Sequence, residues 1–242
     1  MTSDVELIPV IDLLQGQVVR AVRGNRQAYQ PIVSALCASS DPVTVARRLC
    51  AYCAARRLYV ADLDALQGRP AQIGALRALL RAQPGVELWL DAGLADAGAG
   101  QALRGLLELP ASRIVLVYGS ESLRSRQALE GCFANDAGAR GQQAALSLDR
   151  RDGRRLDAAG CWDAVDLWPQ RLIVMTLERV GSAAGPDLDT LRQVRRLAPR
   201  ATLIGAGGIR SQDDLARARQ AGADAWLVAS ALHDLQLPRA RC

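Results

Sequence analysis

Eight short apolar runs, separated by longer stretches with helical spacing, restrict the folds open to this chain more than any other feature. The runs are rich in leucine and β-branched residues and are apolar on both faces, as buried parallel strands are. The predicted strands are Leu7–Leu13, Leu58–Asp64, Val86–Asp91, Arg113–Tyr118, Ala144–Asp149, Arg171–Leu177, Ala201–Ala206 and Ala225–Ala229. Since strands that alternate with helices build parallel sheets, we expect an α/β fold, a closed (β/α)₈ TIM barrel.

Capping residues mark where several of the connecting helices begin. Asp41 stands directly before Pro42, and a capping aspartate followed by a proline is typical of a first helical turn. Asp187 and Ser211 stand at similar positions ahead of two later helical stretches. Barrels of this kind close as one unit at about 250 residues. The 242 residues therefore predict one domain over residues 1–242.

The second half of the sequence repeats the first. Trp89-Leu-Asp-Ala-Gly93 aligns with Leu203-Ile-Gly-Ala-Gly207, which lies 114 positions further along the chain. Val117-Tyr-Gly-Ser120 aligns with Leu227-Val-Ala-Ser230, 110 positions further along the chain. Strands one to four thus recur as strands five to eight. We expect a half-barrel duplication, with halves at about residues 1–122 and 123–242.

The first loop of the first half is far longer than its counterpart in the second half. It extends from Gly16 to Ser40 and carries Arg20, Arg23, Arg26 and Tyr29. Active sites of these barrels lie at the C-terminal ends of the strands, where this loop begins. A long loop at that end predicts a lid, and Arg23 is an expected substrate ligand on it.

The basic residues of the chain are all arginines. The formal net charge is +5 and the sequence contains no lysine, which excludes Schiff-base chemistry through a lysine amine. Most of the arginines stand in helical stretches beside apolar residues, as is typical of a solvated outer face. Only 4% of the residues are aromatic, too few for a base-stacking platform, so no nucleic-acid partner is expected.

Histidine, cysteine and the apolar pattern narrow the possibilities further. The single histidine, His233, rules out a three-histidine metal site and disfavours a Ser-His-Asp triad. Cys50 and Cys53 share one helical stretch without a second pair at zinc spacing, so the cysteines are interpreted as structural thiols. No apolar run approaches the roughly 18 residues of a membrane span. The polar start of the chain, Met1–Glu6, indicates a cytoplasmic protein with no membrane partner.

Two aspartates end strands on opposite sides of the expected ring. Asp12 ends the first predicted strand and Asp149 ends the fifth, at equivalent positions of the two halves. A substrate laid between them would meet one carboxylate on each side. Carboxylates with separated pKa values can serve as general base and general acid. Helix capping is the structural alternative for either residue alone.

A glycine cluster after the seventh strand predicts a phosphate site. Gly207 and Gly208 precede a helix, and main-chain amides exposed by glycines at a helix start bind phosphate without lysine. Ser230 follows the eighth strand, and the loops after strands seven and eight are the usual phosphate site of this fold. We therefore expect a small phosphorylated substrate.

The equivalent place in the first half differs in charge. Gly119 and Ser120 remain as expected phosphate ligands, but Asp91 stands where the second half has Gly205, and Glu121 follows the serine. Carboxylates repel a dianion, so this half is expected to bind an amine, a hydroxyl or a metal-bridged group. Further polar residues stand near the expected strand ends. Among them Glu178 is a candidate acid, and the candidate substrate ligands are Asp62, Asp64, Asp91 and Thr176.

Three segments together resemble a known family. They are Ile8-Pro-Val-Ile-Asp-Leu13, Ser147-Leu-Asp-Arg-Arg-Asp-Gly-Arg154 and Ala206-Gly-Gly-Ile-Arg-Ser-Gln-Asp-Asp-Leu215. They resemble the phosphoribosylformimino-aminoimidazole-carboxamide ribotide isomerases of histidine biosynthesis. The resemblance implies an Amadori aldose-to-ketose rearrangement of a bisphosphorylated ribosyl compound without a cofactor. It also implies that Asp12 is the general base and that Asp149 matches a second essential carboxylate.

The sequence departs from this family at two places. After the sixth strand the family has a Thr-Asp-Ile-x-Lys/Arg-Asp-Gly-Thr pattern whose second aspartate is the general acid, whereas here Val180 holds that position. The other departure is Asp91, in place of a glycine of a phosphate loop. Segments such as Tyr59-Val-Ala-Asp-Leu-Asp64 resemble a divergent branch found in organisms with tetrahydromethanopterin-linked one-carbon metabolism.

Three hypotheses remain open from the sequence. The first is an isomerase-like enzyme that acts on a phosphorylated ribosyl or sugar-like compound, with a substrate changed from that of the histidine pathway. The second is a different reaction in a pterin or one-carbon pathway. The third is a non-catalytic ligand-binding barrel, because a fold does not fix a function.

Overall fold

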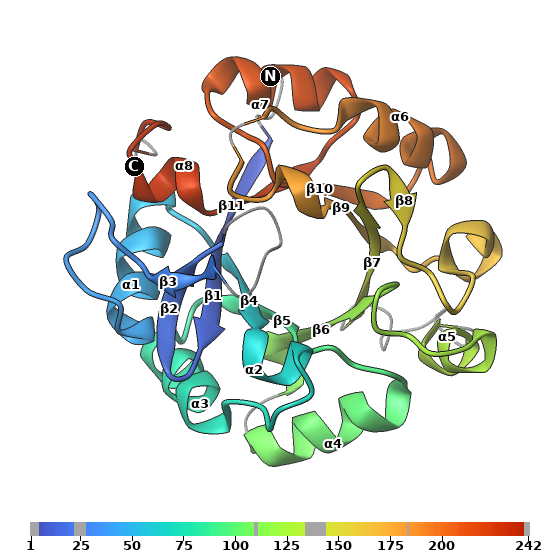
Figure 1. Ribbon diagram of the computed structural model, residues 1–242, viewed down its shortest axis with the longest axis horizontal. Coiled ribbons are helices and arrows are strands. Elements are labelled where there is room, and N and C mark those ends of the chain that lie inside the picture. Colours follow the sequence, from blue (N-terminus) through green and yellow to red (C-terminus); the bar gives the residue numbers. More distant parts are fainter. Residues whose placement is uncertain (1–4, 22–27, 109–110, 134–143, 183, 240–242) are drawn as a thin grey trace.

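The computed structural model describes residues 5–21, 28–108, 111–133, 144–182 and 184–239. Eight parallel strands form a closed ring, and β11 pairs back with β1 through Ile8 and Leu227. In ring order the strands are β1 (Glu6–Leu14), β4 (Arg57–Asp62), β5 (Glu87–Asp91), β6 (Ile114–Gly119), β7 (Ala144–Arg151), β9 (Arg171–Thr176), β10 (Thr202–Ala206) and β11 (Ala225–Val228). The predicted (β/α)₈ TIM barrel is confirmed (Figure 1).

Helices surround the ring of strands, as Figure 1 shows. They are α1 (Pro42–Cys53), α3 (Ile73–Ala82), α4 (Ala97–Leu107), α5 (Arg126–Phe133), α6 (Leu188–Leu197) and α7 (Gln212–Gln220), with the one-turn helices α2 (Leu63–Leu66) and α8 (Ser230–His233). Short 3₁₀ turns cover Ala111–Arg113, Cys161–Asp163, Val165–Leu167 and Leu177–Arg179. The predicted caps are present: Asp41, Asp187 and Ser211 each accept a hydrogen bond from an amide three residues further on.

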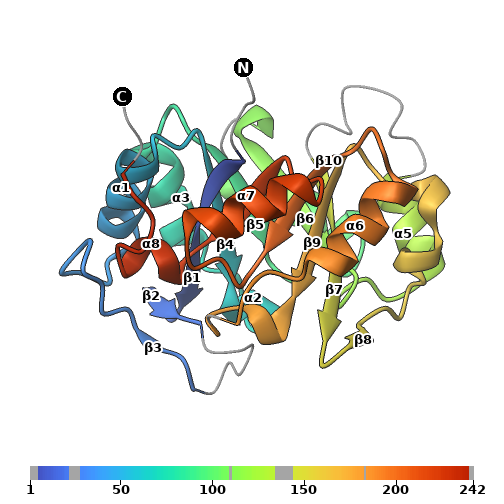
Figure 2. The ribbon, with the colours of Figure 1, turned by 90° about the horizontal axis from the view of Figure 1, so that it is seen from above.

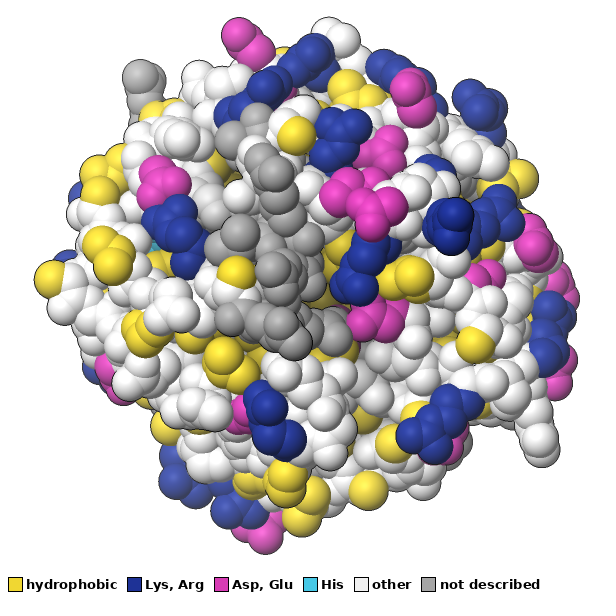
Figure 3. Space-filling view, viewed as in Figure 1, with side chains coloured by type: hydrophobic (Ala, Val, Ile, Leu, Met, Phe, Trp, Pro, Cys, Tyr) yellow, Lys and Arg dark blue, Asp and Glu magenta, His cyan; other side chains and the backbone are white. Residues whose placement is uncertain are grey.

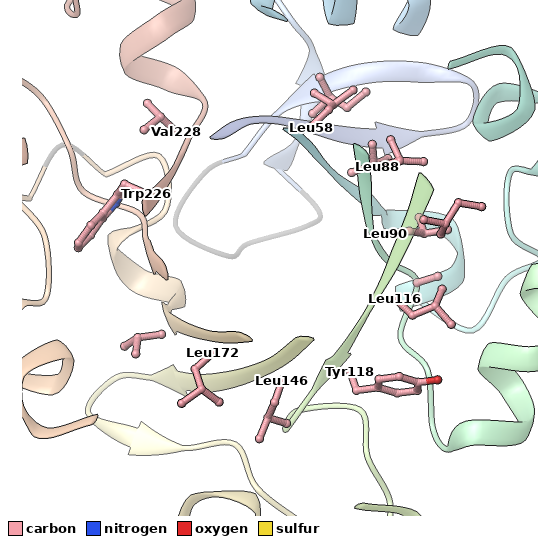
Figure 4. Packing of buried hydrophobic residues seen from close by; sticks show 14 of the residues in the cluster. Leu58, Leu88, Leu90, Leu116, Tyr118, Leu146, Leu172, Trp226 and Val228 are labelled. Carbon is pink, nitrogen blue, oxygen red and sulfur yellow. The ribbon is translucent and has the colours of Figure 1, made fainter. Parts of the chain in front are cut away.

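Two apolar clusters hold the barrel together. The outer cluster lies between the strands and the helices, and Figure 4 shows Leu116, Tyr118 and Leu146 pointing outward from the ring. The inner cluster fills the barrel and includes Trp89 and Ile173, both fully buried. Because successive strand residues point to opposite faces, a strand between two clusters must be apolar on both. This is why the strands were recognisable as continuous apolar runs.

Two antiparallel ribbons extend the barrel at its C-terminal face. β1 continues into β2 (Gln17–Arg20) and β3 (Gln30–Pro31), and β7 continues into β8 (Arg154–Arg155). Figure 2 shows both ribbons on the same side of the molecule. Because they pair with these ribbons, β1 and β7 are each longer than predicted. Asp12 and Asp149 therefore lie two residues before the ends of their strands, not at the ends.

Two other predicted strands are too long. Residues 63–64 belong to α2, because the Asp62 carboxylate accepts a hydrogen bond of 3.2 Å from the amide of Ala65 and starts a helical turn there. Leu177 belongs to a 3₁₀ turn and not to β9. In both cases a turn begins directly at the end of the strand, so side chains that were expected to continue the strand point elsewhere.

The described cysteines are free thiols, in agreement with their interpretation as packing residues. Burial raises the pKa of Cys50 to about 11 and that of Cys53 to about 12, so both thiols stay protonated. Within the described part of the chain, no helix has the length and apolar character needed to cross a membrane.

Candidate active site

A cavity opens at the C-terminal ends of the strands, and it receives side chains from both halves of the barrel. The residues of its lining that matter for chemistry are Asp12, Tyr59, Asp91, Gly119, Glu121, Asp149, Val180, Gly207, Gly208 and Ser230. Figure 3 views this face and shows acidic and arginine side chains next to one another near its middle. A cavity lined by polar groups thus lies at the end of the barrel where the site was predicted.

Asp149 lies at the bottom of this cavity and is almost fully buried. Its carboxyl group accepts hydrogen bonds from the Ser147 hydroxyl at 2.6 Å and the Glu121 amide at 3.0 Å. Burial, with a smaller contribution from the nearby Asp91 and Glu121 carboxylates, raises the pKa of Asp149 to about 8, against the hydrogen bonds that lower it. Asp149 is therefore a neutral acid at about pH 7.

Asp91 also lines the cavity, and its carboxylate accepts two hydrogen bonds. The Tyr59 hydroxyl donates a hydrogen bond of 2.9 Å to Oδ2, and the Gly93 amide donates one of 3.3 Å to Oδ1. Burial, and then the carboxylates of Asp91, Asp149 and Asp12, raise the pKa of Tyr59 well above its ordinary value. Tyr59 therefore stays protonated and acts as a hydrogen-bond donor inside the cavity.

Asp12 and Asp149 occupy matching positions of the two half-barrels. Asp12 pairs with Ala61 of the next strand, and Asp149 pairs with Met175, which is 114 residues after Ala61. Asp12 is half-buried, whereas Asp149 is buried, so the two carboxyl groups have different environments. Four strand-to-strand steps separate β1 from β7 in either direction around the ring. The two carboxyl groups thus enter one cavity from opposite walls.

The other end of the cavity is formed by the glycines after β10. Gly207 and Gly208 both have left-handed φ angles, 80° and 83°, and a Cβ on Gly208 would lie 2.2 Å from the carbonyl oxygen of Gly185. The indole of Trp226 donates a hydrogen bond of 3.2 Å to the Gly207 carbonyl oxygen, which orients this peptide. Ser230 begins α8 and also lines the cavity. The expected ligands Gly207, Gly208 and Ser230 are thus brought together.

The first-half serine expected to bind phosphate has another partner. Ser120 is fully buried, and its hydroxyl oxygen accepts a hydrogen bond of 2.8 Å from the Asp149 amide. It lies 3.4 Å from Oδ2 of the same residue. Gly119 does line the cavity, but a Cβ there would lie 2.8 Å from Asp149 Oδ2. Both residues therefore make room for Asp149 and hold it in place.

Two further expected substrate ligands stabilise loops instead of lining the cavity. Asp62 is fully buried and accepts hydrogen bonds from the amide of Gln72 at 2.7 Å and from that of Ala65. Asp64 accepts from the amide of Gln15 at 3.0 Å and pairs with Arg69. Both carboxylates are satisfied by groups of the protein, because Asp62 caps α2 and Asp64, in the first turn of α2, also accepts from the turn between β1 and β2.

Thr176 and Glu178 are also outside the lining of the cavity. The Thr176 hydroxyl donates a hydrogen bond of 2.9 Å to Asp187, the cap of α6. Glu178 lies in the 3₁₀ turn after β9, and its Oε2 atom is buried without a hydrogen-bond partner among the described residues. Glu178 is therefore not among the residues that line the cavity with Asp12 and Asp149.

Val180 lines the cavity at the place where the resembling family has its acid. It packs against the inner apolar cluster. A Cβ on Gly207 would lie 3.0 Å from the Val180 amide nitrogen, so this turn is closely packed against the glycine loop. The wall between the two ends of the cavity is apolar here, and the acid of that family has no equivalent at this position.

The long loop between β1 and α1 forms hydrogen bonds with α8 and with the residue that follows it. Arg20 donates hydrogen bonds of 2.9 and 2.6 Å to the two carboxylate oxygens of Asp234, and both residues line the cavity. Nδ1 of His233 lies 2.9 Å from the Ser34 hydroxyl, and burial lowers the pKa of His233 to about 4, so it is neutral. Tyr29 lines the cavity as well. Arg23 and Arg26 lie outside the described residues.

Sequence reasoning missed several groups that shape the site. Tyr59 and Ser147 looked like ordinary strand residues, yet each places a hydroxyl beside a carboxylate. For Ser147 there was a signal: a polar residue two positions before an aspartate in a buried strand faces the same side as that aspartate. The Arg20–Asp234 pair joins residues 214 positions apart, so only the closed barrel reveals it.

The fold and the cavity define the class of this protein. It is a closed (β/α)₈ barrel with a carboxylate-lined cavity over the C-terminal strand ends. The chain belongs to the histidine biosynthesis protein family, whose model matches residues 6–238. The resemblance inferred from the sequence is confirmed.

Similar curated proteins span nearly the whole chain. A phosphoribosyl imidazole-4-carboxamide isomerase of Thermomicrobium roseum is 30% identical over 243 residues, which cover 94% of this chain and 92% of that protein. The isomerase of the same name from Symbiobacterium thermophilum is 34% identical, with 88% and 84% covered. An uncharacterized protein of Methanocaldococcus jannaschii is 26% identical, with 94% and 93% covered.

Proposed function

We propose that this protein is an isomerase that converts a phosphorylated ribosyl or sugar-like aldose derivative to the ketose by an Amadori-type rearrangement. The observation that carries the proposal is the pair Asp12 and Asp149, which line one cavity from opposite walls. Asp149 holds its proton near neutral pH, and Asp12 stands in a more exposed position. A neutral acid and a carboxylate base in one cavity are the groups that this reaction needs.

The reaction, on a sugar that carries an amine at C1, uses each carboxyl group twice. Asp149 donates its proton to the ring oxygen, the bond between that oxygen and C1 breaks, and the electron pair of the nitrogen makes C1 an iminium carbon. Asp12 then removes the proton from C2 to give an enolamine and returns it to C1, while the proton of the C2 hydroxyl goes back to Asp149 and C2 becomes a carbonyl carbon. No electrons are exchanged with another molecule, so the rearrangement calls for no redox cofactor.

The glycine end of the cavity supplies binding. We assign the amides of Gly207 and Gly208 and the hydroxyl of Ser230 to a phosphoryl group of the substrate. A phosphoryl group held there anchors the substrate in the cavity that Asp12 and Asp149 also line. Such positioning can contribute a large part of the rate, because the reacting groups are oriented before the reaction.

We propose that the substrate differs from that of the histidine pathway. Val180 leaves an apolar wall where the resembling isomerases have an acid, and Asp91 adds a carboxylate where they have a glycine. The full-length similarity to the uncharacterized M. jannaschii protein is consistent with a divergent branch of the family. The second hypothesis, another reaction in a pterin or one-carbon pathway, stays a prediction. Both hypotheses predict a phosphorylated ligand, and they differ in its identity.

The test first identifies the ligand and then replaces each of the two carboxylates. Native mass spectrometry of gently purified protein identifies a retained compound, whose turnover is then measured. Asp12→Asn and Asp149→Asn each abolish turnover, whereas the exposed Asp213→Asn on α7 does not. Turnover by the wild-type protein declines as the pH rises through about 8, because Asp149 loses its proton. Full turnover by Asp12→Asn would refute the proposal.

A further inference from the structure

The internal repeat provides equivalent glycine peptides after β5 and β10, and of these Gly207 lines the cavity, while in the first half Asp91, two residues before Gly93, lines it. Gly93 follows β5 as Gly207 follows β10, 114 positions later. Both have a left-handed φ angle, 64° for Gly93 and 80° for Gly207. The two loops share this conformation at the first glycine, whereas at the next position Gly208 is left-handed and its equivalent, Leu94, is not. Each half of the barrel therefore has one such glycine amide.

In the first half, a side chain of the protein occupies the glycine amide. The Gly93 amide donates its hydrogen bond to Oδ1 of Asp91, at 3.3 Å. In the second half the residue equivalent to Asp91 is Gly205, which has no side chain to reach Gly207. A side chain cannot be introduced there, because a Cβ on Gly205 would lie 2.2 Å from the ring of Trp226. The Gly207 peptide stays open to a ligand for steric reasons.

The serine position shows the same difference. Ser230 lines the cavity, whereas its first-half equivalent, Ser120, is fully buried against Asp149. The next amide, that of Glu121, donates its hydrogen bond to Asp149 Oδ2 at 3.0 Å. In the first half, two carboxyl groups of the protein thus occupy the amides that an external anion would need.

The negative charge of the first-half carboxylates also disfavours an external anion at this place. Asp91 and Glu121 line the first-half end of the cavity, and the proximity of both carboxylates contributes to the raised pKa of Asp149. A second dianion placed beside Gly93 would meet the Asp91 carboxylate at close range, and like charges at such distances repel strongly in a partly buried site. A group that donates hydrogen bonds would instead be attracted there.

We propose that Asp91 determines the substrate class: one phosphoryl group, bound by Gly207, Gly208 and Ser230, and a hydrogen-bond-donating amine or hydroxyl group at the opposite end. This inference rests on the proposed phosphate end of the cavity and adds that the first-half position is closed to a second phosphate. Asp91 thereby acts as a specificity residue that distinguishes monophosphates from bisphosphates. Tyr59 holds its carboxylate in place.

The experiment opens the closed position. Crystals of wild-type protein soaked in inorganic phosphate contain one phosphate in the cavity, at Gly207 and Gly208. Asp91→Gly, which copies Gly205, contains a second one at Gly93. The control Asp91→Asn removes the charge but keeps an oxygen acceptor for the Gly93 amide, so it contains only one. Two phosphates in the wild-type cavity, or one in Asp91→Gly, would overturn the inference.

Binding in solution gives a second measurement that does not depend on the variant. Ribose 5-phosphate and ribose 1,5-bisphosphate are compared by calorimetry, and the wild-type protein binds the bisphosphate no more tightly than the monophosphate. A preference of tenfold or more for the bisphosphate would overturn the inference even if Asp91→Gly fails to fold. An absence of any phosphate at Gly207 and Gly208 would instead refute the proposed function, so the two failures are distinguishable.

Discussion

The Tyr59 hydroxyl donates a hydrogen bond of 2.9 Å to Oδ2 of Asp91, which joins β4 to the end of β5 inside the cavity. Tyr59→Phe removes this donor from the Asp91 carboxylate. Since hydrogen bonds to charged groups contribute about 1.5–3 kcal/mol, we expect the free energy of unfolding to fall by this amount in urea titrations. Tyr52→Phe is the control, because Tyr52 donates to a neutral carbonyl oxygen, that of Leu237. Equal losses in the two variants would show that Asp91 is not ionised.

Asp149 makes folding stability depend on pH in a defined direction. Its pKa is about 8 in the folded protein and 3.8 as an ordinary aspartate, so between these values the folded state binds the proton more tightly than the unfolded state does. Stability is therefore lost as the pH rises through this window.

Asp149→Asn carries no titrating group and lacks this loss. Relative to the wild type, the variant gains stability as the pH rises from about 4 to about 8, by several kcal/mol at about 1.4 kcal/mol for each pKa unit. Guanidinium unfolding at a series of pH values measures the difference. A constant difference across the series would contradict the raised pKa.

Gly208 is expected to tolerate no side chain. Its φ of 83° costs an alanine about 1–2 kcal/mol, and the added Cβ would in addition lie 2.2 Å from the Gly185 carbonyl oxygen. Gly208→Ala therefore loses both stability and phosphate binding. Gly68→Ala, with a φ of 78° and open space around its Cβ, loses only the backbone contribution and binds phosphate normally. Thermal unfolding with and without phosphate distinguishes these results.

Val180 predicts weak activity toward the histidine-pathway substrate. A positioned general acid contributes about 10²–10⁴-fold to a rate, and this protein has an apolar side chain where the resembling isomerases have that acid. We expect no growth when the gene is placed in a bacterial strain that lacks the isomerase, while the T. roseum relative restores growth. Robust growth would show that Asp149 replaces the missing acid for that substrate as well.

The barrel could be predicted because its physical cause is visible in the chain. Strands buried on both faces must be apolar throughout, and caps such as Asp41 and Ser211 must stand directly before their helices. The placement of Asp12 and Asp149 in one cavity followed from the internal repeat and from the position of active sites in this fold. These inferences depend on local sequence and on topology alone.

Other parts of the site depend on turn geometry that residue types do not encode. Asp62 and Glu178 stand close to strand ends in the sequence, yet a helical or 3₁₀ turn begins there and neither residue lines the cavity. Ser120 was expected to face a ligand and instead contacts Asp149, because these residues meet only when β6 lies beside β7. Such contacts between strands have no signature in either segment alone.

Closure of the ring by β1 and β11 has a consequence for protein synthesis. Ile8 pairs with Leu227, and Arg20 with Asp234, so the contacts that complete the cavity join segments more than two hundred residues apart. Contacts at such separation form late, because the intervening chain loses much entropy when it is closed into a loop. A nascent chain on the ribosome already contains Asp12 and Asp149 but lacks Ser230. It therefore lacks a residue of the proposed phosphate site until translation has passed β11.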